Sequence, residues 1–292
     1  MTFAENPTGP VRPSTGRQLW NKVPEITIFF WIIKVLCTTV GETCSDFLSE
    51  TLKFGDLYTG LIMGAILAIV LVIQFKTRSY KAGVYWLAVV LISIVGTLIS
   101  DYFADVQHVP LIFTTIFFSG ALAVTFIVWY VVENTLSIHT IYTFRREVFY
   151  WLAILFTFSL GTAAGDLLAE KFELGYLVSV LIFAGAIALV TALYYGVKLN
   201  AVFAFWAAYV MTRPLGGSLG DLLSSPRSEG GLALGTVGTS TVFLTAILAA
   251  VIYLIITKKD VATKPYTLAV DTGEEPWTEN VSLRWDQAKP ND

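Results

Sequence analysis

Long apolar runs alternate with short polar segments along most of the chain. A helix needs roughly 20 residues to cross the hydrocarbon core of a bilayer, and eight runs reach that length. They lie near residues 25–48, 57–75, 82–104, 110–132, 147–168, 175–196, 199–222 and 232–257. A membrane β-barrel would show short alternating segments instead. The pattern therefore predicts an all-α polytopic membrane protein with eight spans.

Composition agrees with this interpretation and also marks the ends of the chain. Hydrophobic residues make up 55% of the 292 residues and charged residues only 14%, against roughly 25% charged in soluble domains. Residues 1–22 contain three prolines among small polar residues, and 258–292 contain an acidic cluster. We predict a disordered N-terminal tail over 1–22, a membrane domain over 23–257 and a flexible C-terminal tail over 258–292.

Basic residues gather on one side of the predicted bilayer. With eight spans, both ends of the chain share a side with the loops that follow spans 2, 4 and 6. That side holds Arg12, Arg17, Lys22, Lys76, Arg78, Lys81, Arg145, Arg146, Lys198, Lys258, Lys259, Lys264, Arg284 and Lys289. The other side holds only Lys53, Lys171 and Arg227. Because cytoplasmic segments carry the excess of Lys and Arg, we expect both termini to be cytoplasmic.

A four-times repeated motif organises the spans. Tryptophan is followed ten residues later by glycine and fifteen residues later by aspartate, in the pattern W-x9-G-x4-D. The members are Trp31, Gly41 and Asp46; Trp86, Gly96 and Asp101; Trp151, Gly161 and Asp166; and Trp206, Gly216 and Asp221. Four matches at one spacing indicate internal repeats. We place the repeats at about 23–78, 79–134, 145–197 and 198–257.

Each repeat contains two spans, so all four copies share one orientation in the membrane. Such parallel repeats are related by rotation about the membrane normal. The odd-numbered spans carry ionisable side chains and many hydroxyls, whereas the even-numbered spans carry almost nothing ionisable except Glu133 at one end. Charge facing lipid costs at least roughly 2.5–3.5 kcal/mol per group. We therefore predict the odd helices inside and the even helices outside.

The repeated aspartates define the candidate site. Fifteen residues correspond to roughly 22 Å of helix, which places the four aspartates at one depth, in the extracytoplasmic third. Carboxylates with hydroxyl oxygens suit hard divalent cations. We expect metal ligands from Glu42, Asp46, Asp101, Asp166 and Asp221. Lys34, Thr43, Thr97, Thr162 and Arg213 are the expected path and charge-balancing residues.

Several of these residues have a second interpretation. Each aspartate could instead cap a short interfacial helix, since "DFLSE" and "DLLAE" resemble capping segments. Lys34 is either a group that responds to a bound cation or half of a static ion pair, and Arg213 is expected to pair with a fixed carboxylate. Pro214 should kink or break the seventh span. Cys37 and Cys44 lie about two helical turns apart, too far for a disulfide.

Three stretches carry a resemblance to a known family: "VPEITIFFWIIKVLCTTVGETCSDFLSE" (23–50), "FYWLAILFTFSLGTAAGDLLAE" (149–170) and "FWAAYVMTRPLGGSLGDLL" (205–223). The chain resembles a bacterial family of multi-pass membrane proteins, loosely described as membrane-anchored and mostly without an assigned function. The resemblance covers about residues 20–258. It implies a location in the bacterial inner membrane and supplies no substrate.

The residues favour a secondary transporter that exports a divalent cation, Mn²⁺ before Mg²⁺, through a carboxylate-lined site between odd helices. A non-transporting scaffold or sensor with structural Asp caps, and a transporter of an organic solute held by Lys34 or Arg213, are the alternatives. An enzyme is not expected, because "GGSLGD" (216–221) has Leu219 where the intramembrane protease signature needs glycine. We expect no cofactor, and as partners lipid and the cation but no nucleic acid; homo-oligomerisation is left open.

Overall fold

The computed structural model describes residues 18–19, 21–261 and 266–267. It divides into two units, of which one spans Trp20–Pro265 and the other holds the chain ends. In the unit of the chain ends, β1 (Gln18–Leu19) pairs antiparallel with β2 (Tyr266–Thr267). Most of the two predicted tails, 1–17 and 268–292, lies outside the described residues. All further description concerns the larger unit.

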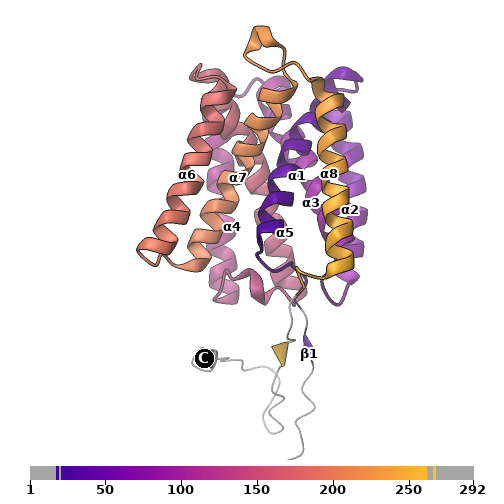
Figure 1. Ribbon diagram of the computed structural model, residues 1–292, viewed down its shortest axis with the longest axis vertical. Coiled ribbons are helices and arrows are strands. Elements are labelled where there is room, and N and C mark those ends of the chain that lie inside the picture. Colours follow the sequence, from indigo (N-terminus) through magenta and orange to yellow (C-terminus); the bar gives the residue numbers. More distant parts are fainter. Residues whose placement is uncertain (1–17, 20, 262–265, 268–292) are drawn as a thin grey trace, which may run out of the picture. The chain divides into compact units, whose positions relative to one another are not determined.

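Eight α-helices form the described part of the larger unit (Figure 1). They are α1 (Ile28–Asp46), α2 (Asp56–Lys76), α3 (Ala82–Asp101), α4 (Leu111–Glu133), α5 (Phe144–Asp166), α6 (Tyr176–Gly196), α7 (Ala201–Ser224) and α8 (Gly235–Thr257). Five-residue π-helical turns extend three of them: η1 (Phe47–Thr51) after α1, η2 (Tyr102–Val106) after α3 and η4 (Leu167–Lys171) after α5. Each of these turns begins directly after an aspartate of the repeated motif.

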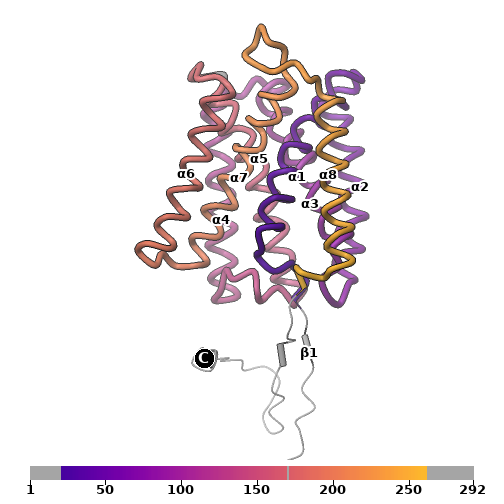
Figure 2. The backbone as a smooth tube through the Cα atoms, in the orientation of Figure 1, coloured from indigo at the N-terminus to yellow at the C-terminus, as the bar shows by residue number. Residues whose placement is uncertain are grey.

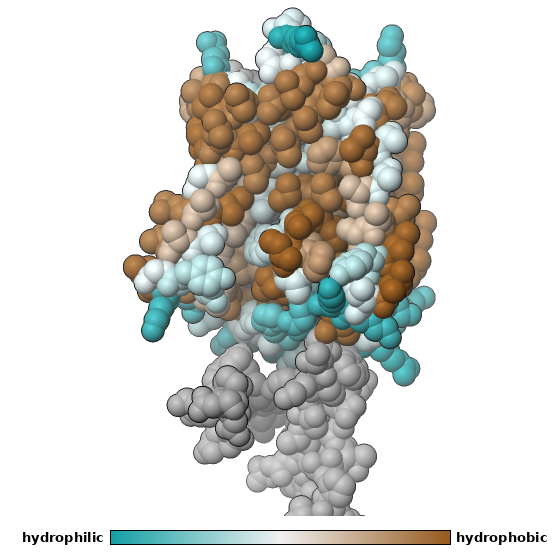
Figure 3. Space-filling model, viewed as in Figure 1, coloured by the Kyte–Doolittle hydropathy of each residue, from teal (hydrophilic) through white to brown (hydrophobic). Residues whose placement is uncertain are grey.

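Seven of the eight helices are long and apolar enough to cross a membrane. The exception is α7, which has 24 residues but carries Arg213 in its middle, followed by proline and two glycines. By length and hydropathy, seven of the eight predicted spans are therefore long and apolar enough to cross a membrane. Helix α7 differs from them in its polar residues and not in its length. The face shown in Figure 3 is mostly hydrophobic between two hydrophilic ends, as expected for a multi-pass membrane protein.

The odd helices form a closed inner ring. Helix α1 packs against α3, α3 against α5, α5 against α7, and α7 back against α1. Each even helix packs on the outside of the ring: α2 on α3, α4 on α5, α6 on α7 and α8 on α1. Figure 2 shows α1 and α8 side by side, although they lie at opposite ends of the membrane domain's sequence. The odd helices are accordingly the more buried ones, with more than half of each of α1, α3 and α5 buried.

The glycine of the repeated motif makes this ring tight. In each inner helix it lies against the residue seven positions after the tryptophan of the next inner helix, and an added Cβ would overlap that neighbour. The pairs are Gly41 with Ser93, Gly96 with Phe158, Gly161 with Arg213, and Gly216 with Thr38. Small residues let helices approach closely in a membrane. One offset serves all four contacts, so the inner helices are parallel and in the same register.

Helix α7 runs unbroken through Pro214, which corrects the expectation of a broken span. Proline removes one backbone donor from the helix. Threonine hydroxyls form hydrogen bonds with two backbone carbonyls near Pro214. Thr212 Oγ1 donates to the Tyr209 carbonyl at 2.7 Å, and Thr38 Oγ1 lies 3.3 Å from the Thr212 carbonyl. Hydroxyl side chains and neighbouring helices are what makes proline tolerable in such helices.

The segment directly before α1 is fixed to the ends of other helices. Lys22 Nζ donates to Glu147 Oε2 at 2.7 Å and to the Phe75 carbonyl at 3.0 Å. Gln74 Nε2 completes the cluster by donating to Glu147 Oε1 at 3.1 Å. The backbone N–H of Glu25 also donates to the Asp260 carbonyl at 2.9 Å. Buried charge stays in place here because it is paired and hydrogen-bonded.

Candidate metal site

All four aspartates of the repeated motif line one cavity between the inner helices. The cavity has a volume of about 660 Å³ and also exposes Glu42 on its wall. Each aspartate is half-buried and Glu42 is buried. The cavity reaches the surface, since exposed Glu50, Asp105 and Glu229 belong to its lining. The equal spacing in the sequence has thus become a single layer of carboxylates in space.

Helix capping does not account for Asp46, Asp101 or Asp221. Asp46 and Asp101 have helical backbone angles, and neither side chain makes a capping hydrogen bond. The chain continues from each of them into a π-helical turn, and Asp221 lies inside α7 rather than at a helix start. Single π-helical turns occur frequently at functional sites. Three of the four aspartates therefore mark the places where inner helices change geometry at the cavity, and Asp221 lies at the equivalent position of the continuous helix α7.

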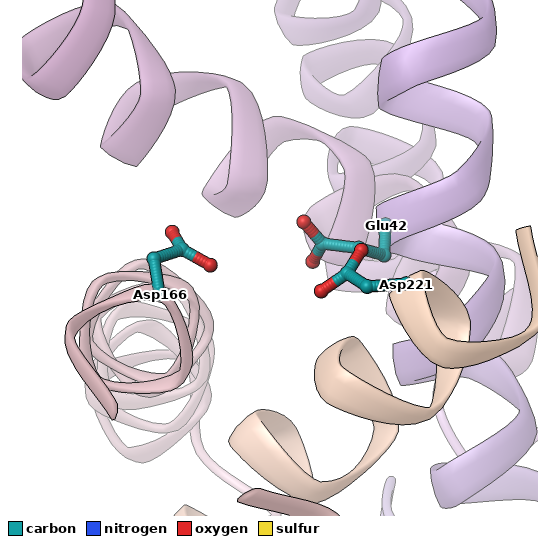
Figure 4. A group of neighbouring side chains, drawn as sticks. All are labelled: Glu42, Asp166 and Asp221. Carbon is teal, nitrogen blue, oxygen red and sulfur yellow. The ribbon is translucent and has the colours of Figure 1, made fainter. Parts of the chain in front are cut away.

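Three carboxylates approach one another most closely. One oxygen each from Glu42, Asp166 and Asp221 lies within 4.8 Å of the others, and Figure 4 shows these side chains converging from three helices. Hard divalent cations sit roughly 2.0–2.6 Å from each oxygen ligand, so ligand oxygens on opposite sides of an ion lie about 4–5 Å apart. The three groups have the spacing that one such ion requires. Asp46 and Asp101 line the same cavity but do not belong to this closest group.

Arg213 closes the floor of the cavity beneath Glu42. Its Nη2 lies 2.8 Å from Glu42 Oε2 and donates to the hydroxyls of Thr162, at 2.6 Å, and Thr97. Glu42, Thr97 and Thr162 occupy the position eleven residues after the tryptophan in repeats 1 to 3, and Gly217 occupies it in repeat 4. A Cβ at Gly217 would crowd both Arg213 and Glu42. The fourth repeat thus leaves room for the guanidinium to reach the other three.

Thr43 is one of the predicted site residues that the structure places away from the cavity. Its hydroxyl accepts from Ser240 Oγ of α8 at 2.7 Å and donates to the Thr39 carbonyl at 3.2 Å. Thr43 follows Glu42 directly, and adjacent residues of a helix point in different directions. Its role is therefore to attach the outer helix α8 to the ring.

Lys34 lies below this floor and has no carboxylate partner among the described residues. It is 1% exposed, and its Nζ makes no hydrogen bond. Instead Nζ sits 4.1 Å from the centroid of the Phe158 ring and 4.2 Å from that of Tyr209. The static ion pair considered for Lys34 from the sequence is absent from the described part of the chain. Two aromatic faces hold the amine in place of an anion.

An aromatic layer fills the axis of the ring at the far end from the cavity. It consists of the residues directly before the four tryptophans: Phe30, Tyr85, Tyr150 and Phe205. All four are buried, and the Tyr85 and Tyr150 hydroxyls lie 2.5 Å apart. The Phe30 and Phe205 rings are 5.9 Å apart. The ring is therefore open toward the carboxylates and closed toward the end from which α1 starts.

The mouth of the cavity contains residues that the motif did not reveal. Glu50, Asp56, Asp105, Glu229 and His108 line it together with the predicted carboxylates. Among the described lining residues nine are acidic and none is Lys or Arg. Their position in the sequence was a usable signal, because they follow the aspartates in loops at the same end of the helices. The cavity wall thus presents a strongly negative field to any approaching ion.

The fold and the site together define a class: a helical protein of four two-helix repeats, with seven helices apolar enough to cross a membrane and one acidic cavity inside the ring. The chain belongs to the family described as "Repeat of Unknown Function (DUF347)", whose model matches residues 29–80, 84–135, 149–200 and 204–260. The four matches begin 55, 65 and 55 residues apart, as the tryptophans do. No curated protein and no solved structure matches the chain.

Proposed function

We propose that this protein is a secondary transporter that carries a divalent metal cation, with Mn²⁺ preferred, across the bacterial inner membrane. The observation that carries the proposal is the convergence of five carboxylates from four repeats on one cavity of a membrane-like bundle. Carboxylates held together repel one another, and a divalent cation relieves that repulsion. We assign Glu42, Asp166 and Asp221 as the closest ligands, with Asp46 and Asp101 completing the wall.

The charge distribution supports export. With the termini in the cytoplasm, as the basic residues indicate, the open end of the cavity faces outward and the aromatic layer lies toward the cytoplasm. The cavity can hold an ion with much of its water shell, since a water molecule occupies about 30 Å³. This outward-open arrangement corresponds, in the export that we propose, to the state that releases the cation to the exterior. Lipid and the cation remain the proposed partners.

Both alternative functions have less support. A scaffold with capping aspartates would have no cavity between the inner helices, whereas one is present. A carrier of an anionic organic solute would need Arg213 or Lys34 in the cavity wall. Arg213 is instead bound to Glu42, and Lys34 lies beneath the floor among aromatic rings.

The test uses the full-length protein reconstituted into liposomes, with Mn²⁺ flux followed by a quenched fluorophore inside. We expect wild-type flux to saturate with Mn²⁺, and Asp166→Asn and Asp221→Asn each to reduce it at least about tenfold, the scale typical of a lost ligand or ligand support. Glu173→Gln is the matched control, because it removes an exposed carboxylate that does not line the cavity. Unchanged flux in both aspartate variants would overturn the proposal.

A further inference from the structure

Lys34 is the one described membrane-embedded cation that no carboxylate neutralises. Arg213 pairs with Glu42, and Lys22 at the bundle end pairs with Glu147. Lys34 Nζ is enclosed by the Phe158 and Tyr209 rings and has no hydrogen-bond partner. The ring faces favour the ammonium form, whereas burial without a counter-ion disfavours any charge. Because these two effects oppose each other, a change in nearby charge can decide whether the amine keeps its proton.

Arg213 connects Lys34 to the cavity. Phe158 lies next to both cations, with its ring centroid 4.1 Å from Lys34 Nζ and 5.6 Å from the guanidinium carbon of Arg213. On its other side Arg213 is neutralised by Glu42, whose oxygen is 2.8 Å away. A divalent cation that takes Glu42 as a ligand removes this neutralising charge and adds two positive charges above the floor. The electrostatic cost of a protonated Lys34 therefore rises when the site fills.

Few charged or titratable groups among the described residues act on Lys34. The charged and titratable groups that act on it among the described residues are Cys37 on its own helix and Arg213 and Tyr209 on α7. Helix α5 contributes the uncharged Phe158 ring. No acidic group of α1, α3 or α8 forms an ion pair with it in the described part of the chain. Loss of the Lys34 proton lowers the positive charge on this side of Arg213.

Tyrosine hydroxyls lie beside Lys34 and in the layer toward the closed end. The Tyr209 ring contacts Lys34, and the Tyr209 hydroxyl has no hydrogen-bond partner among the described residues. The next layer contains the Tyr85 and Tyr150 hydroxyls, 2.5 Å apart. Hydroxyls both donate and accept hydrogen bonds, so they can relay a proton. The layer that blocks the metal ion is therefore lined with groups that can pass a proton.

We propose that Lys34 carries the proton that this protein exchanges for a divalent cation, an inference that rests on the proposed function. When the cation binds Glu42, the N–H bond of the Lys34 ammonium breaks, the electron pair stays on nitrogen, and the proton passes to water at the closed end. When the cation leaves to the outer solution, Glu42 pairs with Arg213 again and Lys34 takes up a proton from water on that side, so that one proton crosses the membrane in the direction opposite to the cation. Metal binding and Lys34 protonation thus exclude each other.

The experiment uses the full-length protein in liposomes, with Mn²⁺ as the probe, a pH-sensitive dye inside and the membrane potential clamped to zero. For each proton exchanged, a gradient of about one pH unit drives about tenfold accumulation of Mn²⁺. We expect this accumulation, together with proton movement, in the wild type. Lys34→Met and Lys34→Arg should still equilibrate Mn²⁺ down its own gradient but lose the accumulation driven by pH. Lys53→Met, which changes an exposed loop lysine, is the matched control.

The outcomes separate this inference from the proposed function. Wild-type Mn²⁺ flux without proton movement overturns the role of Lys34 and leaves the metal transporter standing. Proton-driven accumulation that persists in Lys34→Met also overturns that role. Absence of Mn²⁺ binding and flux in the wild type overturns both. The wild-type measurement decides the first outcome even where a Lys34 variant does not fold, and Mn²⁺-dependent thermal stabilisation shows which variants retain the binding site.

Discussion

The two ends of the inner ring are built from the same four helices and do opposite things. At one end, four aspartates at equivalent positions surround a cavity of about 660 Å³. At the other, four aromatic residues at equivalent positions fill the axis, and the Tyr85 and Tyr150 hydroxyls meet. Like charges repel and admit water, whereas aromatic rings pack and exclude it. Repetition of one residue type in each layer is thus enough to open one end and close the other.

The layers between the two ends differ from repeat to repeat. At the position eleven residues after the tryptophan stand glutamate, two threonines and glycine, and Arg213 reaches three of them from one turn below. At the position three residues after it, Lys34 faces Tyr209. Symmetric layers therefore shape the ring, and asymmetric layers carry the chemistry. The predictions below test this division, beginning with the largest effect.

Removing Arg213 should damage the molecule most. Arg213→Gln leaves Glu42 buried without its ion pair, and breaking a buried pair on one side costs about 3–5 kcal/mol. We expect thermal unfolding in detergent to show a loss of that order, and the double variant Arg213→Gln, Glu42→Gln to recover part of it. Arg227→Gln, in an exposed loop, is the control. Equal stability of the first variant and the control would contradict the role of the pair.

Adding a methyl group between two inner helices should have the second-largest effect on stability. Gly161→Ala places a methyl group against Arg213 and Pro214, and such overpacking costs about 1–3 kcal/mol. Gly185→Ala on the outer helix α6 meets nothing within 4 Å, so it should leave stability unchanged or raise it by up to about 1 kcal/mol through helix propensity. Unfolding midpoints of the two variants measure the contrast. Equal midpoints would show that the ring is not closely packed at this glycine.

Removing the Tyr85 hydroxyl at the closed end of the ring should lower the stability of the protein. Tyr85→Phe removes the partner that lies 2.5 Å from the buried Tyr150 hydroxyl, and a buried polar group left unsatisfied costs about 1–3 kcal/mol. We expect an unfolding free energy lower by about 1 kcal/mol, with Tyr195→Phe as the exposed control. In transport assays the same variant should slow proton movement more than Mn²⁺ movement. A faster Mn²⁺ leak with normal proton movement would assign the hydroxyl pair to sealing alone.

The smallest effect concerns Asp260, beyond the last helix. Burial raises the pKa of Asp260, and the hydrogen bond from Tyr80, at 2.5 Å, opposes that rise. The folded state then holds the proton more tightly than the unfolded state, so stability falls as the pH rises through the ordinary carboxyl range and stays lower above it. Wild type should lose slightly more stability than Asp260→Asn between acid and neutral pH. Identical pH profiles of the two proteins would contradict this.

Much of the fold could be predicted from the sequence because its signals are local or periodic. Apolar runs give the helices, and equal spacing gives the four repeats and the common depth of the aspartates. The order of packing could not be predicted in this way. It depends on which surfaces meet when α7 closes against α1, and a glycine such as Gly216 shows that a neighbour is close without showing that the neighbour is Thr38.

The candidate site was predictable to a similar extent. Equal spacing identified the aspartates of the wall, yet it could not show that Arg213 of α7 pairs with Glu42 of the neighbouring helix α1, 171 positions earlier in the chain. The two residues belong to layers one helical turn apart, and Gly217 removes the side chain that would separate them. Whether side chains of two inner helices form an ion pair depends on their length and on the space that neighbouring side chains leave. Neither property is visible in a spacing pattern.

Closure of the ring also makes the chain suitable for circular permutation. Helix α8 packs on α1, and the hydrogen bond from Glu25 to the Asp260 carbonyl holds both ends of the described bundle together. A short linker could therefore join these ends, and new termini could be placed in the exposed connection 197–200 between α6 and α7. Such a circular permutant would begin with the fourth repeat and keep every contact of the ring. The sequence sets which repeat comes first, whereas in the closed ring every repeat has a neighbour on both sides.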